Sequence, residues 1–147
     1  MSDENYIILK DIKKWSELYE SDKYLILYFT AEWCGPCRRV EPVLKSLNNK
    51  YKSIYMLKID VDNEDTVDIT YSMKISCMPT FIFMKDKKII YSLEGANLEK
   101  LYELVNIFNE SIQFNKEEKN IDNKIEDSSD EGNNIDINSS ESNEYIE

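Results

Sequence analysis

The stretch that decides the fold of this chain is "FTAEWCGPCRRVEP", residues 29–42. It places Cys34 and Cys37 around a Gly-Pro pair, just after the nearly continuous apolar run "YLILYFT" at residues 24–30. Such a run is typical of a strand buried on both faces, and apolar residues recur at helical spacing from Pro36 onward. The two cysteines are therefore expected where a buried strand ends and a helix begins.

This position has a chemical consequence for the two thiols. A helix N-terminus carries about half a positive charge and free N–H groups, so we expect the pKa of the Cys34 thiol to fall below the free value of about 8.5. Pro36 fits the first turn of a helix, where a missing N–H costs nothing. Cys37 lies one turn further on the same face. The spacing thus predicts one attacking thiol and one resolving thiol.

Strand and helix patterns alternate along the rest of the chain. Strands are predicted at residues 6–9, 24–30, 53–62, 80–84 and 89–93. Helices are predicted at residues 11–21, from Pro36 onward, at 64–73, and from Leu98 to Ile112. This order predicts an α/β domain with a central mixed sheet of about five strands, flanked by four helices.

Length and charge set the outline of the molecule. The chain has 147 residues and a formal charge of −11, which is enough for one domain with a substantial core. Most of the acidic excess lies in residues 115–147, which show no apolar period. We interpret residues 1–114 as the domain and residues 115–147 as a disordered acidic tail, which is either a solvated appendage or a docking element.

The charge and the N-terminal composition also indicate partners and location. An acidic balance argues against binding to nucleic acids or anionic membranes. The sequence shows no secretory signal, transit peptide or transmembrane stretch, so we expect a cytoplasmic protein. Thiols are kept reduced in that compartment, and a Cys-x-x-Cys pair there is a redox pair or half of a metal site.

The metal reading of the cysteine pair has little support. Zinc takes four ligands, and the chain has no histidine and only Cys77 as a further cysteine. A zinc site would need a dimer or carboxylates, so we expect no metal. With three glycines and no Gly-rich phosphate loop, we expect no bound nucleotide cofactor either. Cys77 is either a small packing residue or a regulatory thiol.

Several motifs occur in one register. "WCGPC" spans residues 33–37, Pro42 follows in the helix, "KIDVD" spans 58–62, "CMPTF" spans 77–81, and Gly95 precedes the last helix. In these features the sequence resembles the thioredoxin family over about residues 5–112. The acidic tail has no counterpart in a typical member.

The resemblance implies a mechanism and partners. Cys34 would be the nucleophile that forms a mixed disulfide with a substrate protein, and Cys37 would release it. The substrates would be disulfide-containing proteins of peroxiredoxin or reductase type. A thioredoxin reductase would regenerate the dithiol, so NADPH and flavin would belong to that partner and the redox-active disulfide would be this chain's own group. We expect this protein to be a monomer.

The resemblance also assigns a substrate groove. Pro79 would be a cis-proline facing the disulfide, an isomer that costs an X-Pro bond only about 0.5–1 kcal/mol. The backbone of Met78 would pair with an extended substrate segment. The full set of substrate-binding residues implied in this way is Trp33, Gly35, Pro36, Met78, Pro79 and Gly95.

One position departs from the family pattern. Members usually carry a buried Asp six positions before the first active cysteine, and Tyr28 stands there, while the accompanying lysine is present as Lys58. Tyr28 and Lys58 are our candidates for proton transfer and pKa tuning, and Lys58 is a candidate partner for the phenol. A tyrosine is a poor base at neutral pH, so we expect release by Cys37 to be slow unless Glu32 or water takes the proton. The departure and the tail leave a second hypothesis, a binding module of the same fold within a larger assembly.

Overall fold

A mixed sheet forms the centre of the protein. The computed structural model describes residues 4–125 and the side chains of residues 4–119. The sheet has five strands in the order β1-β3-β2-β4-β5. They are β1 (Tyr6–Ile8), β2 (Tyr24–Thr30), β3 (Ile54–Asp60), β4 (Thr80–Lys85) and β5 (Lys88–Glu94). β1, β3 and β2 run parallel, and β4 and β5 complete the sheet in antiparallel pairings, which confirms the predicted mixed sheet.

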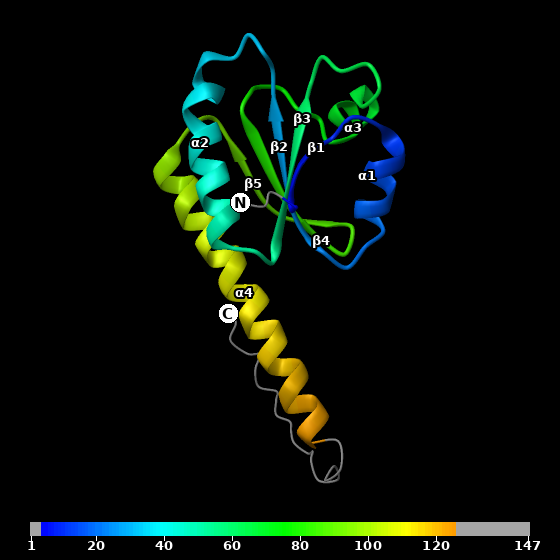
Figure 1. The fold of residues 1–147 in the computed structure, drawn as a ribbon, viewed down its shortest axis with the longest axis vertical. Helices are drawn as coiled ribbons and strands as arrows, with labels where there is room; N and C mark the ends of the chain where they lie inside the picture. The colour runs from blue at the N-terminus through cyan, green and yellow to red at the C-terminus, as the bar shows by residue number, and fades with distance from the viewer. Residues whose placement is uncertain (1–3, 126–147) are drawn as a thin grey trace, which may run out of the picture. The chain divides into compact units, whose positions relative to one another are not determined.

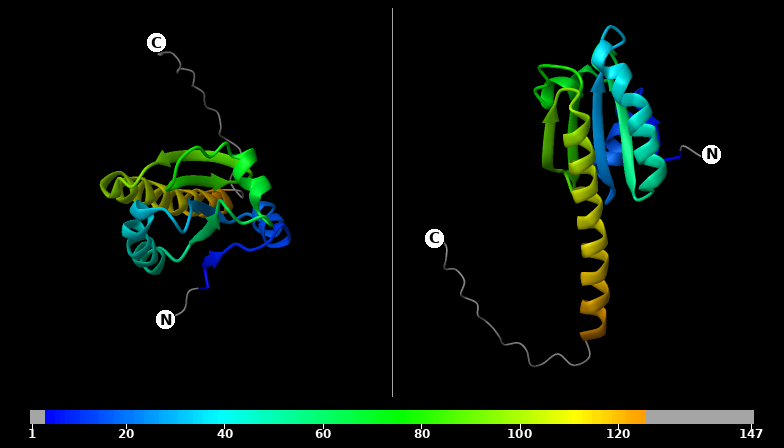
Figure 2. Two further views of the ribbon diagram at one scale, coloured as in Figure 1. Left: turned by 90° about the horizontal axis from the view of Figure 1, so that it is seen from above. Right: turned by 90° about the vertical axis from the view of Figure 1, so that its left-hand side faces the viewer.

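Helices cover both faces of this sheet. They are α1 (Ile12–Tyr19), α2 (Gly35–Lys50), α3 (Val67–Ser72) and α4 (Leu98–Ile125). Figures 1 and 2 show α2 and the first turns of α4 on one face, with α1 and α3 on the other. The four predicted helices are therefore confirmed, and the fold is that of an α/β domain.

β2 is buried on both faces because its side chains alternate between two cores. Ile26 and Tyr28 belong to the core that α2 and α4 cover. Leu25, Leu27 and Phe29 belong to the core on the side of α1 and α3. The strand that precedes the cysteine motif is thus held from both sides, and it places that motif at the carboxyl end of the central strand.

The last helix differs from its predicted extent. The apolar pattern predicts a helix only to Ile112, followed by a disordered segment from residue 115, but α4 continues to Ile125. Residues 115–125 are therefore helical. By their contacts the residues form two units, Met1–Ile112 and Gln113–Glu147. Residues 126–147 lie outside the described residues, so the disorder of that part and the domain boundary at residue 114 stay predictions.

The length and apolar character of the helices show whether any of them could span a membrane. Within residues 4–125, none combines the length and the apolar character needed to cross a lipid bilayer.

Candidate active site

The two cysteines lie where the sequence pattern places them. α2 begins at Gly35, and Cys34 is its N-cap residue. Cys34 and Cys37 are joined by a disulfide, with Cα atoms 5.4 Å apart. The Cys37 N–H also points to the Cys34 sulfur, at an N–S distance of 3.2 Å. A negative charge on the Cys34 sulfur would therefore be stabilised by the free N–H groups of the first turn and by the helix dipole.

The two cysteines are buried, but the neighbouring residues of the motif are exposed to solvent. The cysteines are only 5% and 2% exposed, respectively. Gly35 and Pro36 are exposed on the first turn of α2. Trp33 is 67% exposed, and its indole N–H donates to Asp62 Oδ2 over 2.8 Å. This hydrogen bond to the loop after β3 fixes the ring beside the motif.

A proline loop precedes β4. The Met78–Pro79 peptide bond is cis, as the resemblance implies, and Met78 packs against the core cluster that contains both cysteines. The Gly95 N–H donates to the Pro79 carbonyl over 2.7 Å. Gly95 has φ +96°, a conformation that favours glycine. The loop and the start of the segment before α4 are thus adjacent, while their role in substrate binding stays a prediction.

Cys77 lies in the same loop as the cis-proline. It is a free, half-buried cysteine. Its carbonyl accepts a 2.7 Å hydrogen bond from the Thr80 hydroxyl, and its sulfur lies 3.8 Å from the Thr80 hydroxyl oxygen. Both contacts are local, and the regulatory role stays a prediction.

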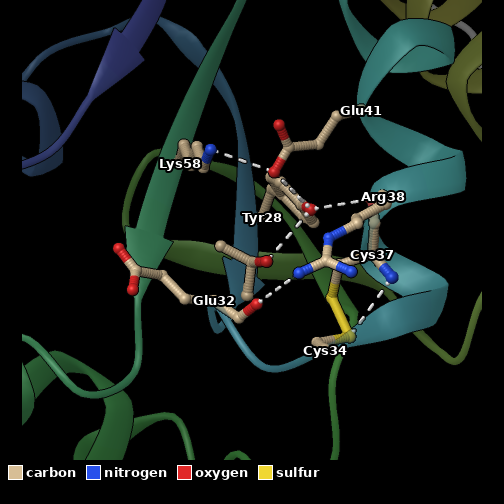
Figure 3. A network of polar contacts seen from close by, with 8 residues as sticks. Tyr28, Glu32, Cys34, Cys37, Arg38, Glu41 and Lys58 are labelled. Atoms are coloured by element: carbon tan, nitrogen blue, oxygen red, sulfur yellow. Dashed lines mark hydrogen bonds and ion pairs between the residues drawn. A yellow bond between two sulfur atoms is a disulfide. The ribbon is translucent and has the colours of Figure 1, made fainter.

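Tyr28 is the centre of a polar network beneath the motif (Figure 3). The phenol is 1% exposed. Its oxygen lies 3.1 Å from Thr30 Oγ1, 3.3 Å from the Cys37 carbonyl oxygen and 3.1 Å from Glu41 Oε2. The phenol therefore lies between the Cys37 backbone and a carboxylate on the next turn of α2, and its single hydrogen has these two acceptors within reach.

Lys58 completes this network, although not as the sequence suggested. Its ammonium lies 2.9 Å from Glu41 Oε2. The neighbouring strand position makes Lys58 a candidate partner of the Tyr28 O–H, but Lys58 pairs instead with the carboxylate that the phenol also contacts. A carboxylate can only accept hydrogen bonds when ionised, so it takes the phenol hydrogen, and the Thr30 hydroxyl can donate to the phenol oxygen.

This environment keeps the phenol neutral. Burial raises the pKa of Tyr28 well above its ordinary value, and the negative charge of Glu41 adds to the rise. A hydrogen bond from Thr30 acts in the opposite direction and is outweighed. Tyr28 is therefore a hydrogen-bond donor and not a base.

A pocket of about 890 Å³ opens beside the disulfide. It is lined by residues from β1, β2, β3 and α2, among them both cysteines, Glu41 and Lys58. The residues predicted to contact substrate, such as Trp33 and Pro79, do not line it. The disulfide thus adjoins a polar pocket as well as the exposed rim. In the described part of the chain, no group of three or more His, Cys, Asp or Glu side chains could hold a metal ion.

The comparison with protein families decides the assignment. The thioredoxin family model matches residues 7–108, which include both cysteines, the cis-proline loop and Gly95. The chain belongs to the thioredoxin family. Its fold and its cysteine pair are those of a thiol-disulfide oxidoreductase.

Individual thioredoxins agree with this assignment. Human thioredoxin is 40% identical over 85 residues, which cover 58% of this chain and 79% of that protein. The oxidised structure of thioredoxin O2 from Arabidopsis thaliana matches with a TM-score of 0.66 and 26% identity over 71% of this chain and 95% of that one. A further match has a TM-score of 0.63 and 29% identity, over 72% of this chain and 98% of that one. It comes from work on thiol resolution in a yeast mitochondrial 1-Cys peroxiredoxin by the glutathione and thioredoxin systems.

Within this thioredoxin site, sequence reasoning missed Glu41. A signal was available, because Glu41 follows Cys37 by four residues and such pairs share one face of a helix. The alternative proton acceptor considered from the sequence, Glu32, is exposed. In Figure 3 its carboxylate points away from the cysteine pair, and only its carbonyl is used, as acceptor for Arg38 Nη2 over 3.2 Å.

Proposed function

We propose that this protein reduces disulfide bonds in other proteins through its Cys34/Cys37 dithiol. The observation that carries the proposal is the position of Cys34 at the N-cap of α2, with Cys37 one turn behind it. Because the helix end stabilises a thiolate, Cys34 is the sulfur suited to attack. Cys37 is the more buried of the two, and it is suited to the second, intramolecular step.

The reaction proceeds by two thiol-disulfide exchanges. The Cys34 thiolate attacks one sulfur of the substrate disulfide, and the other substrate sulfur leaves as a thiolate. The resulting mixed disulfide is then attacked by the Cys37 sulfur, which forms the Cys34–Cys37 bond and releases the second substrate sulfur. Two electrons pass from the dithiol to the substrate, and the protein ends in the disulfide form described above.

We place the substrate backbone beside the cis-proline loop. Met78 would offer its main chain to an extended segment of the substrate, as an added strand. Trp33, Gly35 and Pro36 would contact the same segment from the motif side, and Gly95 would leave room for it. The exposure of Trp33, Gly35 and Pro36 supports this arrangement.

Turnover requires partners for both half-reactions. We propose that a thioredoxin reductase, using NADPH and flavin, returns the disulfide to the dithiol, and that the setting is the reducing cytoplasm. Peroxiredoxin-type or reductase-type enzymes are the substrates we favour. The likeness to a structure from work on peroxiredoxin thiol resolution supports that choice.

Reduction of insulin with NADPH and a thioredoxin reductase tests the proposal. We expect the wild-type protein to sustain NADPH oxidation and Cys34→Ser to abolish it. Cys37→Ser should accumulate a mixed disulfide with the substrate, detected by mass spectrometry, because attack is possible but release is not. Equal trapping by both variants would contradict the assigned roles, and an inactive wild type would contradict the function.

A further inference from the structure

Glu41 is placed where release of the substrate needs a proton acceptor. In the reduced protein Cys37 is a thiol, and it must lose its proton before it can attack the mixed disulfide. Tyr28 occupies the strand position of the usual carboxylate, and it donates its single phenol hydrogen instead of accepting a proton. We propose that Glu41 replaces that carboxylate and accepts the Cys37 proton during the second exchange, an inference that rests on the proposed disulfide reduction.

The geometry brings the two groups together from one helix. Glu41 follows Cys37 by four residues on α2, so both side chains lie on the same helical face. Both also line the pocket of about 890 Å³ beside the disulfide. Its size is enough for water, so a proton can pass from the sulfur to the carboxylate through a water molecule.

Two contacts hold the carboxylate in this place. The Lys58 ammonium from β3 lies 2.9 Å from Glu41 Oε2, and the Tyr28 oxygen from β2 lies 3.1 Å from the same atom. The phenol also lies 3.3 Å from the Cys37 carbonyl oxygen. The three elements therefore fix the carboxylate relative to the backbone of the resolving cysteine (Figure 3).

The neighbourhood explains why Glu41 and not Tyr28 takes this part. Burial raises the pKa of Tyr28 and keeps its proton in place, whereas Glu41 is half-buried at the pocket wall and can exchange a proton with solvent. Other charged side chains line the same pocket and bear on any dependence on pH: Lys10, Glu32, Arg38, Asp60 and Asp65.

The step balances as follows. The Cys37 S–H bond breaks, and its proton goes to the Glu41 carboxylate. The Cys37 thiolate attacks the Cys34 sulfur, the Cys34–Cys37 bond forms, and the bond from Cys34 to the substrate sulfur breaks. The substrate leaves as a thiolate, which takes a proton from solvent, while Glu41 returns its proton to solvent through the pocket. The dithiol is oxidised and the substrate disulfide is reduced.

Glu41→Gln separates proton acceptance from structure. A glutamine carbonyl can still accept from Lys58 and Tyr28, but it cannot take a proton. In rapid-quench mass spectrometry of the reduced full-length protein with a disulfide peptide, we expect mixed-disulfide formation within about two-fold of wild type. We expect its resolution to slow by about ten-fold or more, with the mixed disulfide accumulating.

The pH profile provides a readout that a structural role would not move. Without an internal acceptor, resolution in Glu41→Gln depends on hydroxide or buffer. Its rate should therefore rise steeply up to the ordinary thiol pKa of about 8.5, while the wild-type rate changes less. Tyr28→Asp added to Glu41→Gln should restore fast resolution, because it supplies a carboxylate at the position usual in the family.

A matched control is Glu103→Gln. Glu103 forms another glutamate–lysine pair, because its Oε1 lies 3.5 Å from the Lys100 ammonium on α4. This substitution should leave both steps unchanged. Equal resolution rates and pH profiles in wild type and Glu41→Gln would overturn the inference while leaving the proposed function intact. A wild type that forms no mixed disulfide and reduces no substrate would overturn both.

Discussion

At the scale of single residues, the site depends on how Tyr28 is accommodated where the thioredoxin family usually has an acid. The phenol is fully buried, stacks on Phe81 with ring centroids 5.5 Å apart, and has three oxygen atoms within hydrogen-bond distance. A buried hydroxyl without partners would cost free energy. These partners remove that cost, and Lys58, the lysine that accompanies the usual aspartate, pairs with Glu41 instead.

Tyr28→Phe tests this residue-level account. Loss of the buried O–H should lower the free energy of unfolding by about 1–2 kcal/mol at pH 7. The folded-state pKa of Tyr28 is raised above the 10.0 of the unfolded state, so the stability that the phenol contributes is fully present below pH 10 and is lost as pH rises further. Wild type should therefore lose stability faster than the variant above pH 10.

Urea denaturation at a series of pH values measures this effect. Tyr102→Phe is the matched control, because Tyr102 is 50% exposed and its hydroxyl can bond to water. We expect little change for it at any pH. Parallel stability curves for wild type and Tyr28→Phe above pH 10 would show that the phenol titrates normally in the folded protein.

At the scale of elements, the connections around the sheet position the site. β2 ends at Thr30, a short loop carries Trp33, and α2 starts within the motif. β4 begins directly after the cis-proline, and β5 ends one residue before Gly95, whose N–H returns to the Pro79 carbonyl. The cysteine pair and the proline loop are thus both attached at strand ends, where the sheet fixes them.

Two glycines at these connections should respond in opposite directions to alanine. Gly95 has φ +96°, and Gly35 begins α2 with no heavy atom within 4 Å of an added Cβ. Gly95→Ala should lower the free energy of unfolding by about 1–2 kcal/mol through backbone strain. Gly35→Ala should leave it unchanged or raise it by up to about 1 kcal/mol, because alanine restricts the unfolded chain. Thermal and urea unfolding of both variants decide it, and equal losses would contradict the argument.

At the scale of the whole molecule, burial along the described part of α4 ends at Ile112. Phe108 packs edge-on against Tyr24, Phe83 and Tyr91, and Ile112 is 2% exposed. Phe114, in contrast, is 59% exposed. The family match also ends at residue 108. Residues 115–119, the part of the helix after Phe114 whose side chains the structure describes, belong to neither of the two buried clusters of the domain.

Truncation separates these parts. A chain ending at Phe114 should melt within about 2 °C of the full-length protein and keep the proposed reductase activity. A chain ending at Ile107, which loses Phe108 and Ile112, should melt more than about 10 °C lower or fail to fold. Differential scanning calorimetry compares the three. A loss of several degrees on ending at Phe114 would show that residues 115–147 stabilise the domain.

The sequence by itself determined the order of the elements and the place of the cysteines. Alternating apolar residues, a Gly-Pro pair at a helix start and turn residues act locally, so the pattern is readable along the chain. The cis Met78–Pro79 bond followed from the resemblance. The far end of α4 was less readable, because residues 115–125 contain helix-forming lysine and glutamate but no apolar period. An apolar pattern reports buried helix positions, so it does not extend to the exposed residues after Ile112.

Only the tertiary structure decided which groups meet beneath the disulfide. Tyr28 and Lys58 are cross-strand neighbours in register, and that adjacency suggested a direct contact. The side chain of Glu41, from a helix packed over the same face, lies within bonding distance of both. Such a meeting depends on how α2 lies across β2 and β3. A helix crossing is set by the packing of the whole core, so neither the period of the chain nor the family motif contains it.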